Sequence, residues 1–273
     1  MRRTLNAANR RLGGLLSAAR LARIGRLSGD DGERIARVVQ RVHAPLEAGS
    51  GQWIDRIEAQ RRELLSCEQA LAPEPGDLDV SHDIGVSVGA ACGVSKSRDA
   101  ATLLHLLVRA HQPNRCIELG TNVGISAAYQ AAALALIGKG RLTTLETSTR
   151  RIEIARRLSR SLGLSNIDFI PGSFEDCLED VLSEGVVDYA FIDGNHRCGP
   201  TLAYFDAIWQ CSSEGALIVF DDIRWSKEMT TAWRRIQRDD RVRIAVDLWE
   251  VGVCVTTRQP SRGAGYRFGP ILF

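Results

Sequence analysis

Long apolar runs, lysines and paired cysteines are all scarce in this 273-residue sequence. No uninterrupted apolar stretch approaches the roughly 18 residues that span a bilayer, which argues against a transmembrane helix. The seven cysteines are scattered, odd in number and without a C-x-x-C pair, which argues against a disulfide framework or zinc knuckle. Only three of the 35 basic residues are lysines, so Schiff-base chemistry is disfavoured. We expect a cytoplasmic protein.

Positive charge is concentrated at the N-terminus. Residues 1–29 hold seven arginines and no acidic residue, so the rest of the chain carries a charge of about −5 within the total of +2. No nucleic-acid partner is expected for such a body. Apolar residues recur at helical spacing between the arginines, and three interpretations stay open. The segment 1–28 packs on its own domain or on a second copy of the chain, docks on an anionic membrane, or is a targeting segment.

Strand and helix patterns alternate after residue 98. A helix over 98–111 is followed by five short apolar runs, separated by helical stretches, at 115–120, 141–146, 167–172, 187–193 and 215–222. This alternation predicts an α/β fold with a parallel sheet and helices on both faces. The runs 241–249 and 251–258 have almost nothing between them and predict an antiparallel hairpin.

Three regions follow from this pattern. Residues 1–97 form a helical N-terminal extension and linker, with helices over 33–71 broken at Ala44-Pro45 and a Gly/Pro-rich loop over 72–97. Residues 98–258 form the predicted α/β domain. Residues 259–273 form an irregular C-terminal tail that folds back.

The first predicted strand runs into a glycine-containing turn, Glu118-Leu119-Gly120-Thr121-Asn122-Val123-Gly124. Ligands of open α/β sheets bind at the carboxyl ends of strands, and glycine lets the backbone approach them closely. The second strand ends in Glu146, a carboxylate that can accept both hydroxyl protons of a ribose. These features alone also fit a nicotinamide dinucleotide, although the turn reads G-x-x-x-G rather than G-x-G-x-x-G.

Taken with the terminal hairpin, this string resembles the first motif of class I S-adenosylmethionine (SAM)-dependent methyltransferases. The resemblance covers about residues 98–258 and implies that they form a SAM-binding catalytic domain. It implies a Rossmann-like, seven-stranded sheet with SAM as methyl donor. It implies that Gly120, Thr121 and Gly124 line the methionine part and that Glu146 binds the ribose. Ser173 and Phe174 fall where the family contacts adenine. The full set of implied cofactor-binding residues is Glu118, Gly120, Thr121, Asn122, Gly124, Glu146, Ser173, Phe174 and Asp193.

Three carboxylates follow the fourth and fifth strands, at Asp193, Asp221 and Asp222. These strands are neighbours in this fold, so the carboxylates converge and repel one another. A divalent cation would remove the conflict, and oxygen ligands favour Mg²⁺, Mn²⁺ or Ca²⁺ over zinc. His196 follows Asp193 by three residues, and an imidazole can accept a proton near neutral pH.

This arrangement is similar to that of metal-dependent O-methyltransferases of the catechol and macrolide-sugar types. The resemblance implies that Asp193, Asp221 and Asp222 hold Mg²⁺ or Mn²⁺ and that His196, with Asp193, is catalytic. His196 would be the general base, at the position where catechol-type enzymes carry lysine. The implied activity is methylation of a hydroxyl on a small sugar or natural-product metabolite, with Arg224 and Trp225 as candidates for lining its pocket.

Other interpretations remain. The protein could be a metal-independent methyltransferase acting on N or O. It could also be a non-catalytic binding protein with a basic docking segment. Asp193 could be purely a cofactor-side residue or a helix cap, and Asp222 could cap the helix that begins near Ser226 or simply face water. His196 could be an ordinary loop histidine. A nicotinamide oxidoreductase is disfavoured, because no lysine lies four residues after a tyrosine.

Overall fold

The structure is a computed structural model, and it describes residues 21–24, 26, 28–71, 83–259 and 265–271. The first 20 residues, which carry most of the arginine-rich segment and its membrane, packing and targeting interpretations, lie outside the described residues. No helix in the described ranges is long and apolar enough to cross a membrane.

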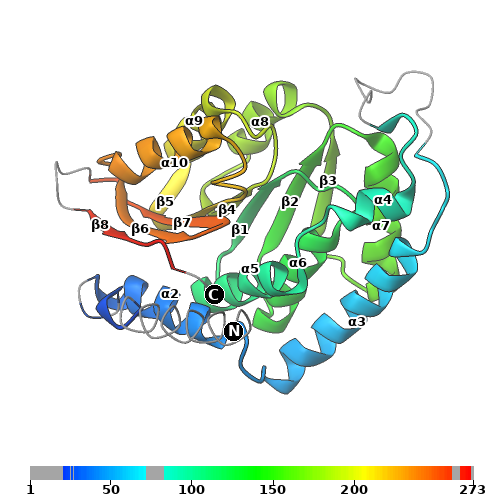
Figure 1. The fold of residues 1–273 in the computed structure, drawn as a ribbon, viewed down its shortest axis with the longest axis horizontal. Helices are drawn as coiled ribbons and strands as arrows, with labels where there is room; N and C mark the ends of the chain where they lie inside the picture. The colour runs from blue at the N-terminus through cyan, green and yellow to red at the C-terminus, as the bar shows by residue number, and fades with distance from the viewer. Residues whose placement is uncertain (1–20, 25, 27, 72–82, 260–264, 272–273) are drawn as a thin grey trace, which may run out of the picture.

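An eight-stranded sheet lies at the centre of the molecule, in the order β3-β2-β1-β4-β5-β7-β6-β8 (Figure 1). Neighbouring strands from β3 to β5 pair in parallel, whereas β7 is antiparallel to both β5 and β6. The predicted α/β fold and terminal hairpin are therefore confirmed. The bounds are β1 (Arg115–Leu119), β2 (Arg141–Glu146), β3 (Ile167–Pro171), β4 (Val187–Ile192), β5 (Ser212–Phe220), β6 (Val242–Leu248), β7 (Val251–Thr256) and β8 (Tyr266–Phe268).

The eighth strand corrects the predicted count of seven. It comes from the C-terminal tail that the sequence led us to expect as irregular, and it pairs in parallel with β6. Phe268 and Ile271 are both buried, so the tail adds apolar side chains to the core while its strand extends the sheet edge.

Helices cover both faces of the sheet, as predicted (Figure 1). Side chains of α8, α9 and α10 form one buried cluster with the sheet, and α2, α5 and α6 contribute to another. A third cluster joins α3, α4, α6 and α7. The bounds are α2 (Gly29–Arg41), α3 (Ala48–Leu65), α4 (Val88–Gly93), α5 (Arg98–His111), α6 (Ile125–Ile137), α7 (Thr149–Leu162), α8 (Phe174–Ser183), α9 (Cys198–Gln210) and α10 (Lys227–Arg238).

Serine hydroxyls begin five of the described helices. Each accepts a hydrogen bond from the backbone N–H three residues further on, which satisfies one of the unpaired donors of the first turn. The five serines, at α4, α5, α7, α8 and α10, are Ser87, Ser97, Ser148, Ser173 and Ser226. Ser87 and the small residues after it explain why α4 forms inside a stretch that the sequence predicts as loop.

Candidate active site

The turn between β1 and α6 packs directly against the end of β4. Gly120 has a φ of +104°, and a Cβ there would lie 2.0 Å from the backbone oxygen of Asp193. Gly124 has a φ of +89°, and its Cβ would lie 2.7 Å from Cβ of Ala155 in α7. Both positions therefore need glycine for the backbone conformation and for the close approach.

Glu146 is fixed at the end of β2 by backbone donors. Asn122 N–H donates to its Oε2 at 2.8 Å, and Ser148 N–H donates to its Oε1 at 3.1 Å. Asn122 itself has a left-handed backbone, with a φ of +49°. A carboxylate oxygen can accept more than one hydrogen bond, so both oxygens retain capacity for ligand hydroxyls.

Glu118 lies beneath this turn and is completely buried. Its carboxylate accepts hydrogen bonds from Gln130 Nε2 at 2.7 Å and from Thr144 Oγ1 at 2.6 Å. The Thr144 hydroxyl also lies 2.6 Å from that of Thr121. The pKa of Glu118 is raised to about 7, mainly by burial and also by the nearby charge of Asp193, against the lowering effect of the hydrogen bonds. The contacts of Glu118 support the turn from inside the protein.

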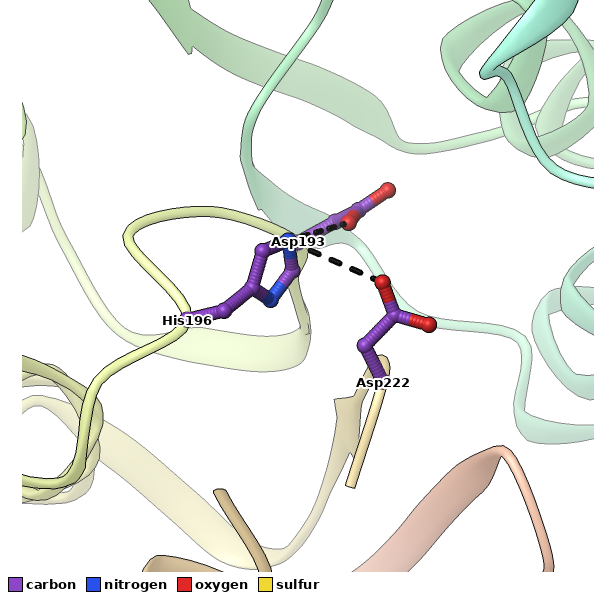
Figure 2. Close-up of side chains that lie close together, drawn as sticks. All are labelled: Asp193, His196 and Asp222. Carbon is purple, nitrogen blue, oxygen red and sulfur yellow. Dashed lines mark ion pairs between the residues drawn. The ribbon is translucent and has the colours of Figure 1, made fainter. Parts of the chain in front are cut away.

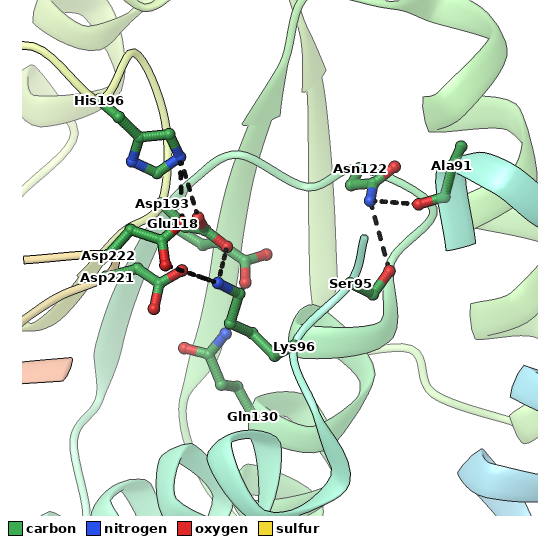
Figure 3. A network of polar contacts seen from close by, with 10 residues as sticks. All are labelled: Ala91, Ser95, Lys96, Glu118, Asn122, Gln130, Asp193, His196, Asp221 and Asp222. Carbon is green, nitrogen blue, oxygen red and sulfur yellow. Dashed lines mark hydrogen bonds and ion pairs between the residues drawn. The ribbon is translucent and has the colours of Figure 1, made fainter. Parts of the chain in front are cut away.

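The three carboxylates predicted to share a cation converge on one point, and the ammonium of Lys96 lies at that point (Figure 3). Lys96 Nζ is in direct contact with Asp221, 3.8 Å from Asp193 Oδ2 and 4.0 Å from Asp222 Oδ1. Burial raises the pKa of Asp193, while the positive charges of Lys96 and His196 lower it. The cluster is therefore partly neutralised by the chain's own lysine.

His196 faces two of these carboxylates, those of Asp193 and Asp222 (Figure 2). Its Nε2 lies 3.7 Å from Asp193 Oδ1 and 3.8 Å from Asp222 Oδ2. Two residues in these loops, Asn195 and Asp222, have left-handed φ values of +52° and +51°. Non-glycine residues in this conformation are often found where a loop is shaped for function.

The interpretation of Asp193 and Asp222 as helix caps finds no support. Ser226 is the N-cap of α10, and Arg197 is at the N-cap position of α9. Neither Asp193 nor Asp222 is therefore the N-cap residue of these helices.

Ser173 and Phe174 lie beside the β4 loop. The Ser173 hydroxyl accepts a hydrogen bond from Asp176 N–H at 3.1 Å and donates to Asp176 Oδ2 at 2.6 Å. The Phe174 ring packs edge-on against Tyr204, with centroids 5.6 Å apart, and a Cβ on Gly194 would lie 2.5 Å from it. These residues adjoin the cluster, and their contact with adenine stays a prediction.

Arg224 is not available for an anionic acceptor. Its two terminal nitrogens donate to the two carboxylate oxygens of Asp247 at 2.7 and 2.8 Å, and it also donates to the backbone oxygen of Trp249. The bidentate pair uses the geometry that would otherwise bind a substrate carboxylate or phosphate. Trp225, by contrast, is 74% exposed.

Lys96 is the site residue that sequence reasoning missed. It lies in the short segment between α4 and α5, which precedes every recognised motif in the sequence. Asn122 Nδ2 fixes that segment by donating to Ala91 O at 2.8 Å and to Ser95 Oγ at 3.3 Å (Figure 3). No motif in the sequence points to Lys96, and the scarcity of lysine bears only on Schiff-base chemistry.

Comparisons with known proteins agree with this architecture. Residues 117–223, less than half of the chain, match a family model described as a methyltransferase domain. A catechol O-methyltransferase of Niastella koreensis is 32% identical over 133 residues, which cover 48% of this chain and 58% of that protein. Tricin synthase 1 of Oryza sativa subsp. japonica is 28% identical over 141 residues, which cover 49% and 54%. The chain thus spans little more than half the length of these curated relatives.

The fold is shared with solved structures. The O-methyltransferase of Bacillus cereus, solved in complex with SAH, aligns with a TM-score of 0.54 and 20% identity over 81% of this chain and 96% of that chain. The sheet and the matched domain confirm the resemblance to class I SAM-dependent methyltransferases. Within that class, the relative from N. koreensis and the structural neighbour from B. cereus are both O-methyltransferases.

Proposed function

We propose that this protein is a SAM-dependent O-methyltransferase that methylates a hydroxyl of a small metabolite of the sugar or natural-product type. The observation that carries the proposal is the contact between the glycine turn and the acid–base cluster. Gly120 lies against the backbone of Asp193, whose side chain faces His196. A methyl donor bound at the turn would therefore lie at the same sheet edge as His196, the proposed proton acceptor.

The residues of the turn suit SAM. The close-packed glycines leave the backbone of the β1–α6 turn uncovered by side chains of their own, and Glu146 is oriented with spare acceptor capacity. SAM, when bound, supplies a methyl group on a positively charged sulfur. Glu146 would hold its ribose hydroxyls.

His196 provides the proton acceptor for the hydroxyl. Its imidazole lies between Asp193 and Asp222, at 3.7 and 3.8 Å, so the imidazolium that forms would be stabilised by two negative charges. The oxyanion and sulfonium charges disappear together in methyl transfer, and exclusion of water favours such a step. Removal of His196 leaves donor binding but removes the base.

The divalent metal that the sequence predicts is a question separate from the roles of SAM and His196. Asp193, Asp221 and Asp222 offer the oxygen ligands that Mg²⁺ prefers, yet the ammonium of Lys96 lies among them. Ligand atoms of Asp193, His196 and Asp222 all lie within 4.8 Å of one another, but a metal there would occupy the proposed base. The predicted donor set is thus not open to an ion, and we derive no step through one.

Location and partners belong to the same proposal. All seven cysteines are unpaired, which supports a cytoplasmic location. The acceptor is a small molecule, and no nucleic-acid partner is proposed. For residues 1–28, membrane contact and packing against a second copy of the chain stay open.

The experiment combines donor binding with an acceptor screen. Calorimetry with SAM compares the wild type with Gly120→Ala and with Gly138→Ala, a control with φ of +79° and no atom near its added Cβ. We expect Gly120→Ala to weaken binding at least about tenfold, or ~1.4 kcal/mol, and Gly138→Ala to leave it unchanged. A mass-detected screen should find methylated hydroxyls, with turnover about 10²–10⁴-fold lower in His196→Ala. A wild type that does not bind SAM, or that methylates only amines, contradicts the proposal.

A further inference from the structure

The side chain of Lys96 brings a positive charge among the three carboxylates. Its side chain is 14% exposed, and that of its direct partner Asp221 is 2% exposed. A buried carboxylate needs a compensating charge, because isolated burial of an ion is costly. The contact is therefore part of the interior of the site and differs from a solvent-exposed ion pair.

The backbone that carries Lys96 is fixed to the cofactor turn. Asn122 donates to Ala91 and Ser95 on one side, and its backbone N–H donates to Glu146 on the other. Ser97 then caps α5 by accepting a hydrogen bond from Ala100 N–H. The position of Lys96 next to the carboxylates thus follows from contacts on both sides of it.

The two faces of the carboxylate cluster are divided between Lys96 and His196. Lys96 faces Asp193 Oδ2 and Asp222 Oδ1, whereas His196 faces Asp193 Oδ1 and Asp222 Oδ2 (Figure 3). The 3.8 and 4.0 Å distances from Nζ are longer than hydrogen bonds. An ammonium has three donors, so it retains donors for an oxygen that enters between these carboxylates.

We infer that Lys96 is a built-in cation that takes the place of a divalent metal at the carboxylate cluster and binds the acceptor oxygen. This inference rests on the proposed function for the identity of that oxygen. The positive charge at Lys96 holds the three carboxylates together and stabilises negative charge on the acceptor as His196 removes its proton. A second, divalent cation at the same point is disfavoured by repulsion from the ammonium.

The test measures binding of Mn²⁺ alone, by electron paramagnetic resonance at pH 7.5. The proteins are the wild type, Lys96→Met, Lys96→Arg and the control Lys139→Met, which alters an exposed lysine in the loop before β2. We expect weak Mn²⁺ binding in the wild type, Lys96→Arg and Lys139→Met. Lys96→Met should bind Mn²⁺ at least about tenfold more tightly, because the carboxylates lose their internal cation. Adding Asp222→Asn to Lys96→Met should remove the gain.

One result would overturn the inference: a folded Lys96→Met that binds Mn²⁺ no more tightly than the wild type does. Circular dichroism checks folding, and Lys96→Gln replaces Lys96→Met if the latter does not fold, with the same result decisive.

SAM calorimetry on the same preparations separates this inference from the proposed function. Absence of SAM binding by the wild type would contradict the proposed function, while the Mn²⁺ titrations would still decide whether Lys96 occupies the cation position. Once an acceptor is known, turnover by the wild type should survive a chelator. It should fall in Lys96→Met and be partly restored by Mn²⁺ in that variant alone.

Discussion

Glu118 is a carboxylate whose environment favours its neutral form. It is completely buried, and burial raises its pKa to about 7, from an ordinary value of 4.5. At a pH between these two pKa values, Glu118 keeps its proton in the folded state and has lost it in the unfolded state. The free energy of unfolding therefore falls as pH rises from about 4.5 to 7, and the loss is complete above that range.

Glu118→Gln should remove this part of the pH dependence. The shift corresponds to about 3 kcal/mol at ~1.4 kcal/mol per pKa unit. We expect the variant, compared with the wild type, to be relatively more stable at pH 8 than at pH 5, because its amide has no proton to lose. Urea unfolding at the two pH values measures this difference, with the exposed Glu179→Gln as control. Identical pH dependence in the wild type and in Glu118→Gln would contradict the assigned pKa.

Residue-scale prediction from sequence succeeded where a motif and a strand end coincide. The positions of Gly120 and Glu146 follow from their places after β1 and β2, since strand ends of a parallel sheet share one edge. Lys96 was not predicted, because it reaches this edge from a segment outside the strand–helix units. Its position depends on long-range hydrogen bonds of Asn122, which no local pattern encodes.

At the scale of elements, Asn122 joins three parts of the fold. Its side chain donates to the segment before α5, and its Oδ1 accepts a hydrogen bond from Arg151 Nη1 of α7 at 3.1 Å. Arg151 Nε in turn donates to the buried carboxylate of Asp83 at 2.8 Å. One amide thus couples the cofactor turn to the segment that carries Lys96.

Asn122→Gly should loosen that coupling without disturbing the turn, because glycine adopts a φ of +49° without strain. We expect SAM affinity to fall about tenfold, which is ~1.4 kcal/mol, and amide exchange at residues 94–97 to accelerate. Calorimetry and hydrogen exchange measure the two effects. Asn166→Gly is the control, since the side chain of Asn166 donates to Ala131 O, away from the site. Equal losses of SAM affinity in both variants would refute the coupling.

The predicted elements agree with the structure where they are long and periodic. The helix expected over 98–111 is α5, and the run 141–146 is β2. The misses are the short elements α4 and β8, which have too few residues for a period to be recognised. β8 forms because β6 offers it a partner, and such a long-range pairing is invisible to local sequence patterns.

At the scale of the whole molecule, the C-terminal tail connects the sheet to the N-terminal helices. After β8, Ile271 N–H donates to Asp247 O at 2.8 Å, and its side chain joins the cluster that contains residues of α2 and α5. Arg243 of β6 forms an ion pair with Asp31 of α2. The extension and tail therefore share one core with the central sheet.

Ile271→Ala should reduce stability while leaving the cofactor site intact. Ile271 is 0% exposed, so removal of its side chain leaves a cavity in a core that cannot fully relax, at a cost of about 2–5 kcal/mol. For a domain of this size, that cost lowers the melting temperature by on the order of 10 °C. Ile84→Ala is the matched control, because Ile84 is 70% exposed and its truncation should change the melting temperature little. SAM affinity at 20 °C should be unchanged in folded Ile271→Ala, and a loss of affinity there would mean that the tail also shapes the donor site.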